Sequence, residues 1–325
     1  IVEDSLKVVA QTNGISTAIA GKGTDLFSRL YEYEPGMVRS VMAKYFGVAY
    51  SAPKPIDLSE DTGKIAMPIR PPNLCAGCPH RASYYAVNSV LKDMGTEAIF
   101  PTDIGCYTLG ILPPLQAADF LVCMGSSVTS AAGISKTTDK KVIAFIGDST
   151  FFHSGITGLI NAVHNQHKFV LVILDNGTTA MTGHQPHPGV DMTPPGWEKP
   201  SVSIEGIVRA CGVEQVAVVN PINVGKTKAA LKDALESDRL SVVVAKAPCP
   251  LFEKRMLGTK QKRAFVVGPE CTGSCRECID TFACPALYRN PDPQGETAMV
   301  INENLCIGCG VCIQICKKIR PKKTK

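Results

Sequence analysis

Two apolar runs near the middle of the chain indicate its fold. Residues 142–146 read Val-Ile-Ala-Phe-Ile and residues 169–174 read Phe-Val-Leu-Val-Ile-Leu, and both are rich in β-branched side chains. Between them, residues 156–166 have a helical pattern of apolar and polar positions. Short apolar runs on either side of a helix predict a β-α-β unit with two parallel strands.

Further elements extend this unit into a doubly wound α/β sheet. We expect strands at 213–219 and 241–245 and a buried strand at 120–123 that encloses Cys123. The small residues of 125–133, beginning with Gly125, predict a closely packed helix start that a ligand or a backbone segment can approach. Another helix is expected at 83–94, with Cys78 and His80 in the loop before it.

The chain of 325 residues is long enough for one large core and a small satellite domain. Residues 1–50 predict the tail of a preceding α/β domain, because Ile1 falls within a strand-and-helix pattern. A proline-rich linker is expected at 51–70. The main α/β domain is then predicted at 71–262 and a small cysteine-rich domain at 263–325.

Polar residues follow both strands of the central unit. Gly147, Asp148 and Ser149 follow the first strand, and Asn176 follows the second. Ligands of parallel sheets bind beyond the carboxyl ends of the strands, and oxygen donors there suit a Mg²⁺ ion that also holds phosphates. Gly147 would let the backbone approach a phosphate at the helix N-terminus. The alternative is that Asp148 and Asn176 only cap turns.

Several neighbours are candidates for the same site. The backbone carbonyl of Thr178 is placed to complete a Mg²⁺ site. Met181 could be the apolar side chain that supports a bent cofactor. His80 and His153 could face the cofactor and are the candidate catalytic residues, although a single histidine is more often structural. The loop that contains His184 and His187 could carry substrate contacts or only connect elements. Gly105, in the segment 102–106 that ends at Cys106, is a further candidate for cofactor binding.

The chain has fourteen cysteines, which indicate metal binding more than disulfides because many lie in tight C-x-x-C clusters. Cys75 and Cys78 form one such pair, directly before a helix. Zn²⁺ and an iron–sulfur cluster both suit this spacing. Cys106 and Cys249, each at an apparent strand end, are candidates for the missing ligands. Spacing alone does not decide their inclusion.

The last sixty residues contain eight more cysteines with few large apolar residues between them. Their spacing is that of bacterial ferredoxins, in which the fourth cysteine of a run reaches across to the other [4Fe–4S] cluster. One predicted ligand set is therefore Cys284, Cys306, Cys309 and Cys312, and the other is Cys271, Cys275, Cys278 and Cys316. Cys271 is one residue further from Cys275 than in that pattern, and Lys317 replaces the usual proline. Zinc is the alternative.

The net charge is +5, and the basic residues concentrate in the last ten positions. This segment predicts a solvated terminus or a contact with an acidic electron carrier, and not a nucleic-acid site, because no aromatic residues are interleaved with it. The sequence has no apolar stretch of membrane-spanning length and no leader pattern. We therefore expect no membrane or nucleic-acid partner and a cytoplasmic location.

The central motif resembles the diphosphate signature of thiamine-diphosphate enzymes, Gly-Asp-Gly followed by Asn, with Ser149 in place of the second glycine. Together with the ferredoxin-type cysteines, it resembles the 2-oxoacid:ferredoxin oxidoreductases. The segments 75–81 (Cys-Ala-Gly-Cys-Pro-His-Arg) and 147–155 (Gly-Asp-Ser-Thr-Phe-Phe-His-Ser-Gly) resemble the large subunit in the indolepyruvate:ferredoxin oxidoreductase family. The similarity extends over residues 70–325.

This resemblance implies specific ligands. Asp148, Asn176 and the Thr178 carbonyl would bind Mg²⁺ beside thiamine diphosphate. Four cysteines, Cys75, Cys78, Cys106 and Cys249, would hold a proximal [4Fe–4S] cluster. Three clusters use twelve cysteines and leave Cys123 and Cys211 as structural residues.

The resemblance also implies an activity. It is the oxidative decarboxylation of a 2-oxoacid, with an arylpyruvate such as indolepyruvate favoured, to an acyl-CoA and CO₂, with electrons passed to ferredoxin. Pyruvate or another 2-oxoacid is an alternative substrate. A non-redox thiamine enzyme and a non-catalytic electron-transfer subunit are alternatives of other classes.

One part that such enzymes need is not found in this sequence. The family activates thiamine with a Glu from a pyrimidine-binding domain. We expect that domain upstream of Ile1 or on a second subunit, within an oligomer.

Overall fold

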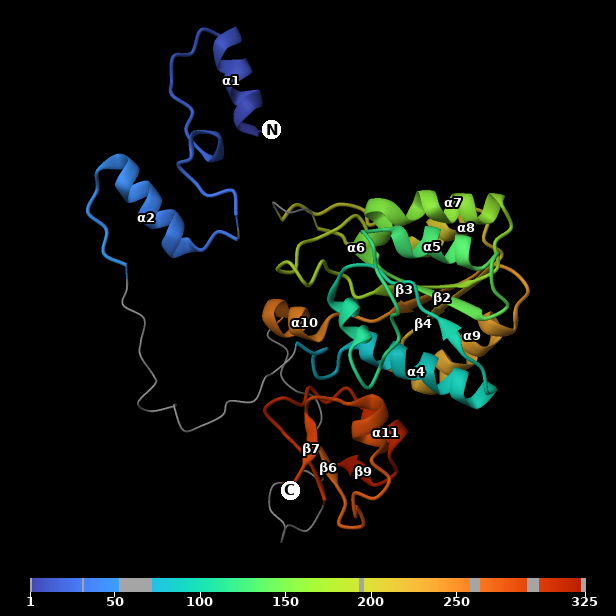
Figure 1. Cartoon of the computed structure of the whole chain (residues 1–325). Coiled ribbons are helices and arrows are strands. Elements are labelled where there is room, and N and C mark those ends of the chain that lie inside the picture. The colour runs from blue at the N-terminus through green and yellow to red at the C-terminus, as the bar shows by residue number, and fades with distance from the viewer. Residues whose placement is uncertain are drawn as a thin grey trace. The chain divides into compact units, whose positions relative to one another are not determined.

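The computed structural model describes residues 2–30, 32–52, 72–192, 196–257, 264–290 and 298–322, which belong to two units, 1–70 and 71–325 (Figure 1). In the first unit, helices α1 (Val2–Thr12) and α2 (Pro35–Phe46) flank a short 3₁₀ turn, Lys22–Thr24. Its described residues contain no strand. From residue 53 onward, the expected linker lies outside the described residues.

The second unit is built on a five-stranded sheet in the order β1-β2-β3-β5-β4, with every neighbouring pair parallel. The strands are β1 (Ala98–Ile99), β2 (Lys141–Gly147), β3 (Val170–Asp175), β4 (Gln215–Val219) and β5 (Ser241–Lys246). Four of them lie where the apolar runs predicted strands. The expected doubly wound parallel sheet is confirmed.

Helices cover both faces of this sheet, as Figure 1 shows. Ile143 and Phe145 of β2 pack on the side of α4 (Pro79–Met94) and α9 (Val224–Glu236). Ala144 and Ile146 pack on the opposite side, with α5 (Ser126–Ile134), α7 (Ile156–His164) and α8 (Ile204–Ala210). Burial on both faces explains why the strand sequences are continuously apolar and do not alternate.

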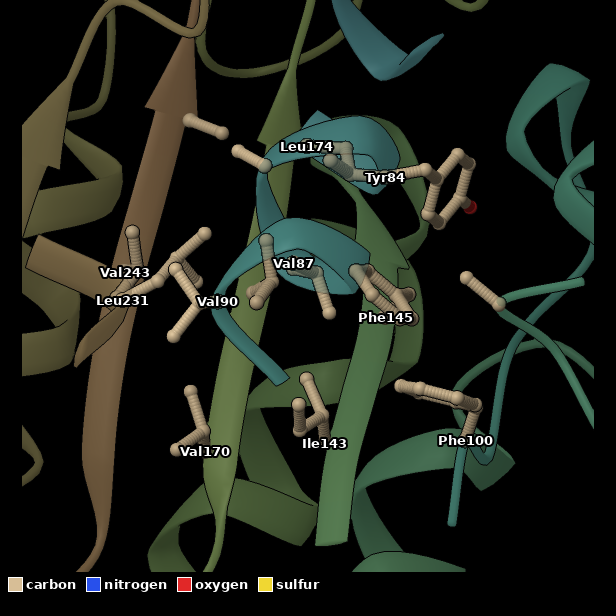
Figure 2. Close-up of a cluster of buried hydrophobic side chains, with 14 of the residues drawn as sticks. Tyr84, Val87, Val90, Phe100, Ile143, Phe145, Val170, Leu174, Leu231 and Val243 are labelled. Atoms are coloured by element: carbon tan, nitrogen blue, oxygen red, sulfur yellow. The ribbon is translucent and has the colours of Figure 1, made fainter. Parts of the chain in front are cut away.

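Phe145 occupies the centre of the first of these cores (Figure 2). Its ring centroid lies 4.8 Å from that of Tyr84 and 6.1 Å from that of Phe100. Replacement of Phe145 by alanine should lower the free energy of unfolding by about 3–5 kcal/mol, because the lost contacts leave a cavity. Urea unfolding followed by circular dichroism measures this change. Ile160→Ala on the exposed side of α7 should shift it by no more than about 0.5 kcal/mol, and equal losses in the two variants would contradict the assignment of this core.

The cysteine-rich region forms two small antiparallel sheets. Strand β6 (Phe265–Val267) pairs with β9 (Ile319–Pro321), and β7 (Leu287–Arg289) pairs with β8 (Met299–Ile301). A π-helical turn, η4 (Cys278–Phe282), and helix α11 (Val311–Ile315) complete it. Phe282 and Val311 pack in one apolar cluster with Ala82 of α4 and Val224 of α9. The region therefore docks on helices α4 and α9, which cover one face of the five-stranded sheet.

Helix α4 begins earlier than expected. It starts at Pro79, so His80 and Arg81 lie in its first turn and not in the loop before it, while Cys78 is the N-cap residue. Proline is well suited to the first position of a helix, since its fixed φ angle is helical and its missing N–H has no helical partner there. The prediction that the helix begins at Ser83 was wrong for this reason.

The expected strand at 120–123 is also absent. Phe120 makes only an isolated parallel bridge with Pro101, and Cys123 is exposed, not buried. Ser126 closes a turn there, because its backbone N–H and its hydroxyl both donate to the Cys123 carbonyl, at 3.0 and 2.7 Å. The turn leads into α5 and takes the apolar run out of the sheet.

No helix of the described residues combines the length and the apolar character that a membrane crossing requires.

Candidate active site and cysteine clusters

The polar residues after β2 and β3 meet at one edge of the sheet. Gly147 is in register with Leu174, so the residues that follow the two strands are neighbours. One carboxylate oxygen of Asp148, Oδ2, accepts hydrogen bonds from the backbone N–H of Asn176 at 3.0 Å and of Gly177 at 2.8 Å. Both Asp148 and Asn176 are buried. The structure thus brings together the two strand ends that the sequence paired.

A cavity opens at this edge. Most of the residues expected to bind a cofactor line it: Gly147, Asp148, Ser149, Asn176, Thr178 and Met181. His80, Gly105, Cys106 and Tyr107 contribute a further part of the wall. A Cβ atom on Gly147 would collide with the Tyr107 ring, so only glycine fits between that ring and the cavity.

Two expected residues do not line the cavity. His153 is exposed on the π-helical turn η3 (Phe151–Gly155) that follows the one-turn helix α6 (Asp148–Thr150). Gly125 is the N-cap of α5, with a φ of +89°, and a Cβ atom there would collide with Ser154. Its conformation and its tight packing account for this glycine without a ligand contact.

His187 makes a contact with Asp148 that the sequence did not predict. Its Nε2 lies 3.0 Å from Oδ2 of Asp148, and both side chains are buried. Ser149 donates its backbone N–H to the other oxygen of Asp148, Oδ1, at 2.7 Å. His187 lies in a proline-rich loop of no regular period, from which only general ligand contacts were expected, so no sequence spacing linked it to Asp148. It holds the orientation of this carboxylate.

His80 contacts the other polar strand end. Its Nε2 lies 3.0 Å from the side-chain nitrogen of Asn176, and burial lowers the pKa of His80 to about 4, despite the opposing charge of Asp148. A neutral ring accepts a hydrogen bond from the Asn176 amide, which fixes the direction of that amide. The amide oxygen, on the other side, accepts from the Thr178 backbone N–H at 3.0 Å. This contact suits a positioning role for His80.

The donor set fits a magnesium diphosphate. The cavity offers a carboxylate, an amide and backbone groups beside a glycine, which are the hard oxygen ligands that Mg²⁺ takes together with phosphate oxygens. Asp175, next to Asn176, is also buried, and burial followed by the nearby Asp148 charge raises its pKa, although Lys246 Nζ lies 3.5 Å from its Oδ2 and opposes the shift. A bound cation would relieve this accumulation of carboxylates.

Four of the candidate cysteines gather next to this cavity. Cys249 interacts electrostatically with Cys75 and Cys106, and Cys75 interacts with Cys78. Burial raises the pKa of Cys75 and Cys106, and that of Cys78 to about 12. Such thiols lose their protons only to a strong positive charge, which bound iron provides. The Cys249 N–H also donates to the Asn176 carbonyl, at 2.9 Å.

The eight cysteines of the small domain fall into two groups. Burial raises the pKa of Cys278 to about 11, and the nearby cysteines Cys316, Cys271 and Cys275 contribute to this increase. Burial likewise raises the pKa of Cys312 to about 12, and its neighbours are Cys309, Cys284 and Cys306. These groups have the same members as the two ligand sets expected from the ferredoxin spacing. Cys271, despite its longer spacing, lies with its set.

All fourteen cysteines lie within the described residues, and none forms a disulfide. The two that belong to no set are Cys123, which is exposed, and Cys211, which is half-buried at the end of α8 and has no cysteine among the groups that shift its pKa. Among the described residues, no three His, Cys, Asp or Glu side chains converge closely enough to hold a single metal ion.

Two of the cysteine loops contact each other. A Cβ atom on Gly77, between Cys75 and Cys78, would collide with the side chain of Ile307, between Cys306 and Cys309. A small hollow lies at this contact, and its walls include Ala76 and Gly77 together with Cys284, Cys306, Cys309 and Cys312. The Cys75 loop thus forms part of the surroundings of the neighbouring cysteine set.

Comparisons with known proteins agree with this arrangement. Residues 103–245 match the thiamine pyrophosphate enzyme family, in its C-terminal TPP-binding domain, and residues 299–318 match a 4Fe-4S binding domain. The chain is 45% identical over 319 residues to the indolepyruvate oxidoreductase subunit IorA of Methanothermobacter marburgensis. It is 40% identical over 338 residues to the subunit of the same name from Thermococcus kodakarensis.

These two alignments each cover 97% of this chain but only 49% and 50% of the relatives, so the chain spans about half the length of the curated relatives it matches. A solved 2-oxoglutarate:ferredoxin oxidoreductase from Magnetococcus marinus has a similar fold, with a TM-score of 0.51 and 21% identity over 56% of this chain and 66% of that chain. The chain therefore contains a TPP-binding domain on a parallel sheet and a C-terminal ferredoxin-like domain, as the sequence predicted.

Proposed function

We propose a function on the premise that the chain is a homologue of the IorA subunits of indolepyruvate oxidoreductases, with residues 103–245 in the thiamine pyrophosphate enzyme family. The protein takes part in the oxidative decarboxylation of a 2-oxoacid to an acyl-CoA and CO₂. Electrons leave through [4Fe–4S] clusters to a ferredoxin. An arylpyruvate such as indolepyruvate is the favoured substrate.

One observation carries this proposal. Cys106 lines the same cavity as Asp148 and Asn176, and it also interacts with Cys75 and Cys249 of the first cysteine set. A cluster on these thiolates would adjoin the thiamine site directly. A decarboxylase or carboligase that releases an aldehyde has no use for an electron acceptor there, and an electron-transfer module has no use for the cavity.

The residues of the cavity divide into two roles. The first role is to hold Mg²⁺ on the diphosphate, which we assign to Asp148, Asn176 and the Thr178 carbonyl. Close to the phosphates would lie Gly147, Ser149 and Gly105, and Met181 would contact the thiamine. His187 orients Asp148, and His80 orients Asn176. When bound, thiamine diphosphate supplies the carbanion chemistry and the clusters accept electrons singly.

The contacts between cysteine sets support one order of electron flow. The set of Cys75, Cys78, Cys106 and Cys249 adjoins the cavity, and its Gly77 touches Ile307 in the set of Cys284, Cys306, Cys309 and Cys312. The remaining set, Cys271, Cys275, Cys278 and Cys316, would then pass electrons out. The basic residues near Cys316 suit an acidic ferredoxin. An activating Glu would come from a further domain or a second subunit.

The proposal is tested with the complete protein, purified anaerobically together with any second subunit. With indolepyruvate and coenzyme A we expect reduction of a viologen dye and formation of an acyl-CoA, measured by absorbance and mass spectrometry. Pyruvate and 2-oxoglutarate serve as comparison substrates for the side-chain preference. Aldehyde release without dye reduction would identify a non-redox thiamine enzyme, and a preparation that binds no thiamine diphosphate would identify an electron-transfer subunit. Either result would overturn the proposal.

A further inference from the structure

Arg81 is a buried cation between two of the cysteine sets. It lies in the first turn of α4, and its side chain is fully buried. Its guanidinium interacts electrostatically with Cys75 and Cys78 on one side and with Cys284 on the other. Two cysteines of one set and one cysteine of the neighbouring set thus share a single arginine.

The hydrogen bonds of Arg81 join the same two regions. Nη1 donates to the carbonyls of Phe282 at 3.0 Å and Ala283 at 2.7 Å, directly before Cys284. Nη2 donates to the Leu74 carbonyl at 2.5 Å, directly before Cys75, and to Oδ1 of Asn73 at 2.8 Å. Phe282 is 201 positions away in the sequence. The planar guanidinium therefore clamps the segments that lead into both cysteine sets.

The charge of this side chain is not balanced by a carboxylate. Within the described residues, no Asp or Glu forms an ion pair with Arg81, and its four hydrogen-bond acceptors are neutral oxygens. Its Nε–H is also buried and has no hydrogen-bond partner there. A buried guanidinium without a counter-charge strongly destabilises a fold. The anions that can balance it are the thiolates around it.

We infer that Arg81 is the shared counter-ion of the two clusters held by Cys75, Cys78, Cys106 and Cys249 and by Cys284, Cys306, Cys309 and Cys312. It is a positioning residue whose charge makes both clusters easier to reduce. This inference rests on the proposed function, which places iron at both sets. A cluster with four thiolates is a dianion when oxidised and a trianion after it accepts one electron, so a nearby cation favours the reduced form.

The step that Arg81 affects transfers one electron and forms or breaks no bond. Each cluster changes from the [4Fe–4S]²⁺ state to the [4Fe–4S]⁺ state. The electron comes from the 2-oxoacid during turnover, or from dithionite in a titration. The guanidinium keeps its proton throughout.

Two substitutions separate the charge of Arg81 from its hydrogen bonds. Arg81→Gln removes the charge, and Arg81→Lys keeps it but cannot form the fork of four hydrogen bonds. The complete protein and its variants are titrated with dithionite under EPR detection, and iron is counted in each. In Arg81→Gln we expect the reduction of the two flanking clusters to become less favourable by about tenfold, which is about 59 mV for a one-electron couple. In Arg81→Lys the potentials should stay near those of the wild type.

Two controls are built into this design. The cluster of Cys271, Cys275, Cys278 and Cys316 should keep its potential in every Arg81 variant, because none of its cysteines interacts with Arg81. Arg209→Gln removes an exposed arginine of α8 that pairs with Glu205. It should change no potential.

Two results would overturn the inference. In the first, Arg81→Gln keeps the iron content and the cluster potentials of the wild type. In the second, Arg81→Gln and Arg81→Lys lose the same amount of iron, which would show that the hydrogen bonds of Arg81 are required and not its charge. If the Gln variant does not fold, the Lys variant decides: normal iron and potentials support the inference, and a lost cluster contradicts it. An iron count near eight in the wild type would instead show that the cluster of Cys75 is absent. That result would contradict the proposed function, independently of the measurements on the Arg81 variants.

Discussion

Replacement of Asp148 by alanine is expected to weaken Mg²⁺-dependent binding of thiamine diphosphate by at least about a hundredfold, because loss of outer-shell partners alone reduces metal affinity by about 10–100-fold. Asp148 lies where the ends of β2 and β3 meet, and its carboxylate receives the Asn176, Gly177 and His187 contacts. Its removal takes away a ligand charge and leaves buried donors without an acceptor. Catalytic turnover should fall with the loss of cofactor.

Isothermal titration with thiamine diphosphate and Mg²⁺ measures this effect, and the iron content of the variant should remain that of the wild type. Asp148→Asn keeps the shape of the side chain and tests the charge alone. Asp238→Asn is the matched control, because Asp238 is exposed and pairs with Lys168, at 2.8 Å, away from the cavity residues. Wild-type cofactor affinity in Asp148→Ala would show that this strand end does not bind the diphosphate.

Cys75→Ala should remove one cluster and stop electron flow while the thiamine site stays intact. The three cysteine sets predict about twelve irons per chain, and the variant should retain about eight. Cys75 belongs to the set beside the cavity but does not line the cavity itself. Dye reduction driven by the 2-oxoacid should therefore fall to background, because the first electron acceptor is missing.

Iron analysis, EPR and titration with thiamine diphosphate check this prediction in the same preparation. Cys211→Ala is the control, since Cys211 is also half-buried but has no cysteine neighbour that shifts its pKa. It should keep all iron and full dye reduction. The assignment of Cys75 as a ligand would be wrong if both variants contained the same iron.

Local patterns in the sequence predicted much of this site. The β2–β3 pair follows from uninterrupted apolar runs, and the meeting of Asp148 with Asn176 follows from the parallel arrangement, because strands of a parallel sheet end at the same edge. The two ferredoxin sets follow from short, regular cysteine spacings. In each case the relevant residues lie within one supersecondary unit, so their separation along the chain carries the geometric information.

The contacts that the sequence did not predict cross between units. His187 reaches Asp148 from an irregular loop 39 positions away, and Arg81 reaches Phe282 from another domain. Neither has a periodic pattern or a fixed spacing. The exposure of Cys123 was missed because hydrophobicity predicts burial on average, whereas the turn closed by Ser126 depends on a local hydrogen bond.

The first turn of α4 has a consequence for how this protein can vary. Three residues of this single turn contact three different parts of the protein. Cys78 belongs to a cysteine set, His80 contacts the Asn176 amide, and Arg81 donates to the small domain. Each residue added to a helix rotates the following side chains by about 100°. One residue inserted between Cys78 and His80 would therefore misdirect the histidine and the arginine together. We expect natural variants of this chain to tolerate substitutions in this segment far better than changes in its length.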